Sequence, residues 1–120
     1  MGVVPFHEMN TYYNASDLVC MTSTREGSPN AIKEAMACDK IIVSTEVGDV
    51  QWLFGSTDGL FLAAHDAVSY SEVLIRALNF SGSNGLKSKG RERILDLKMT
   101  SRQIAERIKA VYTAITLESN

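Results

Sequence analysis

The chain has 120 residues, of which 45% are hydrophobic and 22% are charged, and its formal net charge is -2. This length and composition indicate a single globular domain that spans residues 1–120. The weak negative charge gives no electrostatic basis for nucleic-acid binding, and no apolar run reaches the roughly 20 residues that a membrane-spanning helix needs. We expect a cytosolic protein in which Cys20 and Cys38 are small buried thiols and form neither a disulfide nor a metal site.

The first half of the chain predicts alternating helices and strands. A short helix over residues 7–14 precedes a strand over residues 17–22, whose unbroken apolar run is typical of a strand covered on both faces. A loop and a helix lead to a second strand of this kind over residues 41–44. Asp49 is expected to cap a short helix that carries Trp52, and we place this tryptophan in the core.

A third strand is predicted over residues 60–62, and a long helix capped by Asp66 follows it. The polar, glycine-bearing stretch 81–85 predicts a loop after this helix. Apolar side chains at helical spacing form the expected buried face of the helix, namely Tyr70, Val73, Leu74, Ala77 and Leu78.

Two further helices are predicted toward the end of the chain. The first, over residues 86–97, is charged and is interrupted by Gly90. Thr100 and Gln103 resemble a capping box, in which each side chain bonds the backbone N–H of the other residue, and this box opens the last helix. One face of the last helix is apolar and carries Ile104, Ile108, Val111, Tyr112 and Ile115.

Strands that alternate with helices are typical of a parallel α/β sheet with right-handed crossovers. The sequence therefore predicts a Rossmann-like fold of three layers, with the sheet between two layers of helices. In such sheets, ligands bind at the carboxyl ends of the strands. The loop from Arg25 to Ser28 follows the first predicted strand and is expected to lie at such an end.

The stretch REGSPNAIKE, which begins at Arg25, predicts a loop that runs into a helix. Ser28 is the expected N-cap and Pro29 the expected first helical residue, where its missing N–H group costs nothing. Gly27 lets a ligand approach the backbone closely. The free N–H groups at the start of the helix, aided by the helix dipole, predict a site for an anion such as phosphate.

Two glutamates flank this helix start. Glu26 lies in the loop and Glu34 lies on the first turns of the helix, away from its apolar stripe. Both carboxylates can accept hydrogen bonds from hydroxyl groups, which sugars offer. The alternative is a purely structural role, with Glu34 facing solvent near Lys33 or Lys40 and Glu26 paired with Arg25.

Glu26 and Glu34 are separated by seven residues inside the run REGSPNAIKEAMAC. This run resembles the E-x7-E signature of retaining glycosyltransferases with the GT-B fold, in particular glycosyltransferase family 4, also called group 1. The segments on either side, HEMNTYYNASDLVCMTS and IIVSTEVGDV, resemble the segments that flank the signature in that family. The resemblance runs from about His7 onward and is strongest between Tyr12 and Val50.

The resemblance implies the C-terminal, donor-binding domain of such an enzyme, truncated at its N-terminal side. We expect the first strands of the domain, a glycine turn, a basic pair for the diphosphate and the whole acceptor domain to lie outside this sequence. The resemblance implies that Glu26 is the catalytic residue beside the donor sugar and that Glu34 binds the ribose hydroxyls. The donor-binding residues that it implies between and around them are Gly27, Ser28, Pro29, Asn30 and Ala31, with Pro29 contributing no N–H group.

For the full-length protein, the resemblance implies a hexosyltransferase-like enzyme of polysaccharide biosynthesis. The enzyme would transfer a sugar from a nucleotide-sugar donor to a hydroxyl of a glycan or lipid-linked acceptor, with retention of the anomeric configuration. We expect no cofactor and no metal, because N–H groups at a helix start and basic side chains stabilise the leaving diphosphate. The expected partners are the donor, the acceptor and the missing N-terminal domain, with no nucleic acid. The full-length protein could sit peripherally at the inner membrane surface, and the fragment alone is expected to be inactive.

Two alternatives stay open on the sequence: a regulatory module that binds a sugar nucleotide, and a sugar-nucleotide epimerase of the same fold. Four residues also depart from the pattern of the family. Asp39 and Asp49 stand where glycine is common, Ile41 where proline is common, and Trp52 where an acidic residue is common. Aspartate can adopt the left-handed conformation after a helix, so we expect the turn at Asp39 to survive. The departures leave the glutamate pair intact and the identity of the donor open.

Overall fold

The structure is a computed structural model that describes residues 2–118. Its three strands, β1 (Leu18–Met21), β2 (Ile41–Thr45) and β3 (Leu60–Ala63), form one sheet in the order β1-β2-β3. Both neighbouring pairs are parallel, with Leu18 opposite Ile41 and Ile42 opposite Leu60. The predicted parallel α/β fold is confirmed.

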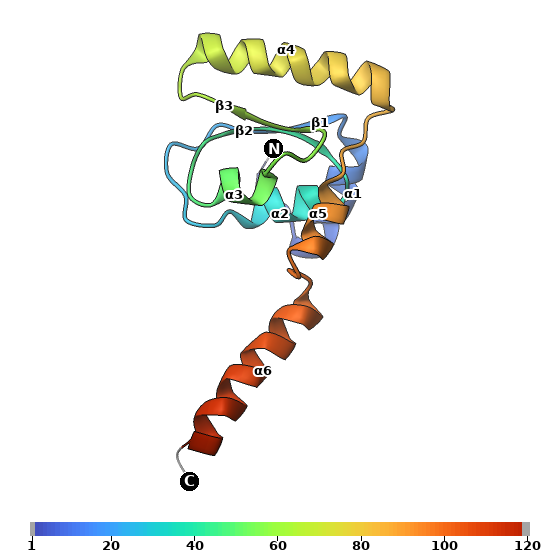
Figure 1. Ribbon diagram of the computed structural model, residues 1–120. Helices are drawn as coiled ribbons and strands as arrows, with labels where there is room; N and C mark the ends of the chain where they lie inside the picture. The colour runs from blue at the N-terminus through green and yellow to red at the C-terminus, as the bar shows by residue number, and fades with distance from the viewer. Residues whose placement is uncertain (1, 119–120) are drawn as a thin grey trace.

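Helices cover both faces of the sheet, so the domain has three layers (Figure 1). The helix α4 lies on one face, and α2, α3 and α5 lie on the other, while α6 projects away from the domain. Among residues 2–118, no helix is both long and apolar enough to cross a membrane. The helices are η1 (Phe6–Glu8), α1 (Met9–Ala15), α2 (Asn30–Ala37), α3 (Val50–Phe54), α4 (Ala67–Asn84), α5 (Gly90–Asp96) and α6 (Ser101–Glu118).

The core consists of two apolar clusters, one on each face of β2. On the α2 side, Ile32 and Met36 are fully buried and share their cluster with Ile42. On the α4 side, Ile41 and Val43 pack with residues of α4. Successive residues of a strand point to opposite faces, so the unbroken apolar run of β2 supplies both clusters. Ile32 and Met36 thus pack α2 on this face of the sheet.

Three side chains that we expected to be buried are exposed, and one of them is Leu78 of α4, which is 52% exposed. Trp52 is 56% exposed because the short helix α3 turns Val50, Leu53 and Phe54 toward the core and leaves Trp52 on its outer side. Cys20 is also exposed. It lies on β1, the edge strand of the described sheet, and therefore has a neighbouring strand on one side only.

The segment after α4 also differs from the prediction. The expected loop at 81–85 is the last turn of α4, which continues to Asn84 and ends at Gly85 in the left-handed conformation, with φ of 69°. Gly90 begins α5 and does not interrupt a longer helix. A Cβ atom at Gly90 would lie 2.8 Å from the backbone of Met36, so the glycine lets α5 approach α2 closely.

Three local predictions are confirmed. Asp39 adopts the left-handed conformation, with φ of 54°. The Asp66 carboxylate accepts a hydrogen bond of 2.8 Å from the N–H of Ser69 and caps α4. Thr100 and Gln103 form the capping box, since each side chain accepts a hydrogen bond of 3.3 Å from the backbone N–H of the other.

Candidate functional site

The loop after β1 is held by the turn that follows β2. The N–H of Asp49 donates a hydrogen bond of 3.0 Å to the carbonyl of Gly27. Gly48 has φ of 53°, and a Cβ atom there would lie 1.9 Å from the same carbonyl oxygen. The two backbones therefore touch where only glycine fits, and this contact fixes the position of Gly27.

The start of α2 is arranged differently from the prediction. The helix begins at Asn30, so Pro29 is the N-cap and not the first helical residue. The Ser28 hydroxyl does not cap the helix, because it donates a hydrogen bond of 2.5 Å to the carboxylate of Asp49. Ser28 and Asp49 are 21 positions apart, so a rule based on local sequence could not find this pairing. Among residues 2–118, no side chain caps α2, and the N–H groups of its first turn stay without a side-chain acceptor.

Lys33, which we did not predict as a site residue, adds a positive charge to this helix start. Its Nζ atom donates to the carbonyl of Ser28 over 3.2 Å and to Oδ1 of Asn30 over 3.3 Å. The spacing from Asn30 to Lys33 places both side chains on one side of the helix and could have indicated the contact. The ammonium group and the open N–H groups together form a positively polarised site.

Glu26 is exposed in the loop, and one of its carboxylate oxygens accepts a hydrogen bond from a neighbouring side chain. The Ser23 hydroxyl donates a hydrogen bond of 3.0 Å to Oε1 of Glu26. The backbone carbonyl of Ser23 accepts a hydrogen bond of 2.6 Å from the hydroxyl of Thr45, which is only 3% exposed. The segments that follow β1 and end β2 thus orient the exposed Glu26 side chain through Ser23.

Glu34 is half-buried and contacts α1. The Tyr13 hydroxyl donates a hydrogen bond of 3.1 Å to Oε2 of Glu34. Burial, reinforced by the neighbouring carboxylate, raises the pKa of Tyr13 to about 12, so this phenol stays protonated at neutral pH. Glu34 therefore does not simply face solvent, and the neighbouring Lys33 ammonium donates to Ser28 and Asn30 instead.

A cavity of about 330 Å³ opens beside Glu34. Its volume falls within the range of pockets that bind small molecules, about 300–1,000 Å³. Its wall is mainly apolar, and Glu34 is the one carboxylate among the residues that line it. These residues are Phe6, His7, Met9, Asn10, Tyr13, Glu34, Ala37 and Cys38.

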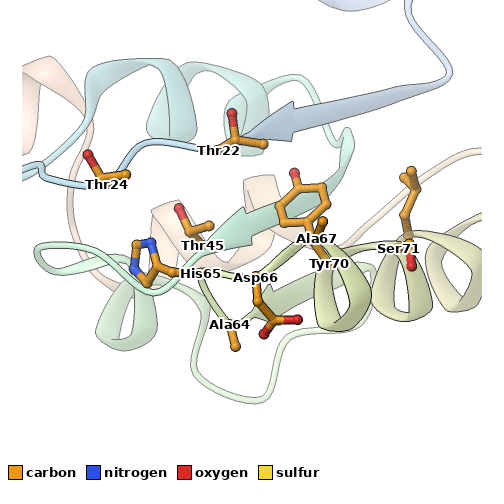
Figure 2. A pocket seen from close by; sticks show the side chains of 10 residues that line it. Thr22, Thr24, Thr45, Ala64, His65, Asp66, Ala67, Tyr70 and Ser71 are labelled. Atoms are coloured by element: carbon orange, nitrogen blue, oxygen red, sulfur yellow. The ribbon is translucent and has the colours of Figure 1, made fainter.

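A second cavity, of about 380 Å³, lies at the carboxyl ends of the strands, beside the start of α4 (Figure 2). Tyr70 points from α4 toward the end of β1, and its hydroxyl donates a hydrogen bond of 2.9 Å to the carbonyl of Val43. Burial raises the pKa of this phenol above its usual range. The hydroxyl of Thr45 is also bonded within the protein. None of the predicted site residues lines this cavity.

The predicted site residues thus fall into two adjoining groups on α2 and its loop. Glu26, Gly27 and Ser28 lie against the turn after β2. Glu34 lies one to two turns into the helix and faces α1. The uncapped N–H groups at Asn30 and Ala31 lie between the two groups. A ligand with an anionic centre and hydroxyl groups at both ends matches this order of chemical groups.

The parallel sheet with helices on both faces is part of an α/β domain of the GT-B type, and one helix start with two glutamates forms its candidate site. Residues 1–79 match the family model of the glycosyl transferases group 1, and the chain belongs to this family. The expected family and fold are confirmed.

Two relatives illustrate the likeness. A protein of Bacillus subtilis (strain 168) with the provisional name teichuronic acid biosynthesis glycosyltransferase TuaC is 35% identical over 75 residues, which are 62% of this chain and 19% of that protein. The solved structure of sucrose-phosphate synthase from Thermosynechococcus elongatus matches with a TM-score of 0.86 and 25% sequence identity. That match covers 98% of this chain and 30% of the synthase chain. The chain therefore spans less than a third of either relative.

Proposed function

We propose that the full-length protein transfers a sugar from a nucleotide-sugar donor to an acceptor hydroxyl with retention of the anomeric configuration. In this proposal, the chain supplies part of the donor site and does not turn over alone. The observation that carries the proposal is the uncapped start of α2 between two glutamates that neighbouring side chains hold in place. Membership of the glycosyltransferase family supports a transferase over the epimerase alternative.

The diphosphate of the donor would bind at the start of α2. The N–H groups of Asn30 and Ala31 have no side-chain acceptor there, and the helix dipole favours an anion at this end. Gly27 and Ser28 offer further backbone N–H groups in the preceding loop. The Lys33 ammonium lies beside them and would neutralise part of the charge. Such fixed donors stabilise a leaving diphosphate without a metal ion, and metal independence is part of the proposal.

The nucleoside would bind beside Glu34. A carboxylate that accepts hydrogen bonds from both ribose hydroxyls is well placed on the wall of the 330 Å³ cavity. The apolar part of that wall, which includes Phe6 and Met9, suits the flat face of a base. The proposal leaves the identity of the base open.

Glu26 would lie beside the donor sugar. Its carboxylate can accept hydrogen bonds from sugar hydroxyls while the Ser23 hydroxyl donates to Oε1. As the bond between sugar and diphosphate breaks, positive charge develops on the sugar, and a nearby carboxylate stabilises it. The provisional name of TuaC suggests the wider setting, and we propose that the full-length protein also builds a polysaccharide on a glycan or lipid-linked acceptor.

A titration of the isolated chain tests the donor site. With UDP, ADP or GDP as probes, we expect the largest amide NMR shifts at Ser28, Asn30 and Ala31. Affinity should be weak, because in this proposal the chain supplies only part of the donor site. Uridine, which lacks the diphosphate, is the matched control and should leave these amides unchanged. Largest shifts elsewhere, or no shift with any of the three diphosphates, would contradict the proposed site.

A further inference from the structure

We propose that Tyr13 is a positioning residue that holds the Glu34 carboxylate toward the ribose hydroxyls of a nucleoside diphosphate. The inference rests on the function proposed above and adds a residue to the donor site. Its basis is the hydrogen bond of 3.1 Å from the Tyr13 hydroxyl to Oε2 of Glu34, which joins α1 to α2 across 21 positions of sequence.

Packing explains the ring of Tyr13 but does not explain why this residue carries a hydroxyl group. The ring is 8% exposed and belongs to the core cluster on the α2 side, where phenylalanine would pack equally well. A buried hydroxyl is costly unless it is hydrogen-bonded. It has two acceptors within reach, Glu34 and the carbonyl of Ala31 at 3.3 Å, and the carboxylate is the nearer. Since a phenol has a single hydrogen to donate, the charged acceptor is favoured.

This bond occupies one face of one carboxylate oxygen and leaves the rest of the group available. A carboxylate has two oxygens and about four acceptor positions, so Oε1 of Glu34 and the remaining positions can receive ligand hydroxyls. Tyr13 and Glu34 both line the cavity of about 330 Å³, so the oriented carboxylate lies on the wall where a nucleoside would bind. A glutamate fixed before binding loses less conformational entropy when the ligand arrives, which strengthens binding.

The test replaces one hydroxyl group and keeps the ring. In the 120-residue chain, Tyr13→Phe should weaken the binding of UDP, ADP or GDP about fivefold to tenfold, the size expected for the loss of one ordinary intramolecular hydrogen bond. Tyr12→Phe is the matched control on the same helix. Tyr12 is 40% exposed and does not line the cavity, so this variant should bind like the wild type. Dissociation constants from NMR titration measure both effects.

A second comparison separates positioning from a loss of packing. The effect of Tyr13→Phe should be absent with a 2′,3′-dideoxynucleoside diphosphate and with inorganic diphosphate, because neither offers ribose hydroxyls to Glu34. The effect should also be absent in a chain that already carries Glu34→Gln. If Tyr13→Phe weakens all these probes equally, Tyr13 acts through packing alone and the inference is overturned.

The remaining outcomes distinguish this inference from the proposed function. If Glu34→Gln weakens nucleoside diphosphate binding and Tyr13→Phe does not, the inference fails while the proposed donor site stands. If Glu34→Gln binds all three diphosphates as tightly as the wild type, the ribose role of Glu34 fails and the inference fails with it. The thermal unfolding midpoint of each variant verifies that the chain is folded during the titrations.

Discussion

At the scale of single residues, the two glutamates differ in what holds them. Ser23, at the end of β1, orients Glu26, whereas Tyr13 of α1 orients Glu34. The spacing of the glutamates is visible in the sequence, but their partners are not. The bond from Tyr13 to Glu34 spans 21 positions, and the bond from Thr45 to Ser23 spans 22. Only the folded sheet brings these groups together. The sequence therefore predicted the two glutamates but not the residues that orient them.

Kinetics of the full-length protein should separate the two glutamates. A carboxylate on the ribose interacts equally in the ground state and the transition state, so Glu34→Ala should raise KM for the donor. The expected loss is about 1.5–3 kcal/mol, as for hydrogen bonds to a charged group. Glu26→Ala should mainly lower kcat, because its contacts strengthen as charge develops on the sugar. Steady-state rates at varied donor concentration measure both. Wild-type kcat and KM in both variants would mean that the pair is surface charge only.

At the scale of helices and strands, rules based on local sequence predicted helix ends correctly where the contacting residues are close together in the sequence. The capping box at Thr100 and the cap at Asp66 were predicted because their partners lie three positions away. The cap of α2 was predicted wrongly because Asp49, from the turn after β2, takes the hydroxyl of Ser28. The end of α4 was placed too early because small polar residues are weak helix breakers. The helix continues until Gly85 supplies a left-handed end.

The turn after β2 gives a prediction at this scale. Gly48→Ala should destabilise the domain by at least about 2 kcal/mol, since alanine is strained at positive φ and its Cβ has no room. The new atom would lie 1.9 Å from the carbonyl oxygen of Gly27, so the loop that carries Glu26 must move as well. Chemical denaturation measures the change in the free energy of unfolding, and the amide shifts of Gly27 and Ser28 measure the movement of the loop.

A second glycine provides the control for this substitution. Gly82 lies inside α4, and a Cβ atom there would meet nothing within 4 Å. Gly82→Ala should leave stability unchanged or raise it by up to about 1 kcal/mol, because alanine is the better helix former. If Gly48→Ala is as well tolerated as Gly82→Ala, the contact between the turn and the loop does not hold the site.

At the scale of the whole molecule, the sheet and the last helix form separate parts. The order and direction of the three strands were predictable, because unbroken apolar runs between helices require a buried parallel sheet. Whether the apolar face of α6 is buried was not predictable from the sequence. Its apolar face looks in the sequence like a buried face, yet Ile108, Val111 and Tyr112 are 53%, 59% and 70% exposed. An apolar periodicity shows that a helix has a face to cover but does not say what covers it.

Removal of α6 tests whether the rest of the chain folds without it. A chain ending at Thr100 keeps Leu97 and Met99, which pack against the core, and loses only residues that bury little against the sheet. We expect its thermal unfolding midpoint to stay within about 2 °C of the 120-residue chain, a change below the roughly 4–8 °C that 1 kcal/mol produces in a small domain. The amide spectrum of residues 2–96 should also be unchanged.

As a control, a chain ending at Asn84 lacks α5, whose Ile94 is 7% exposed, and should lose its cooperative transition. A midpoint that falls by 10 °C or so without α6 would correspond to more than about 1 kcal/mol and would show that the helix packs on the domain in solution.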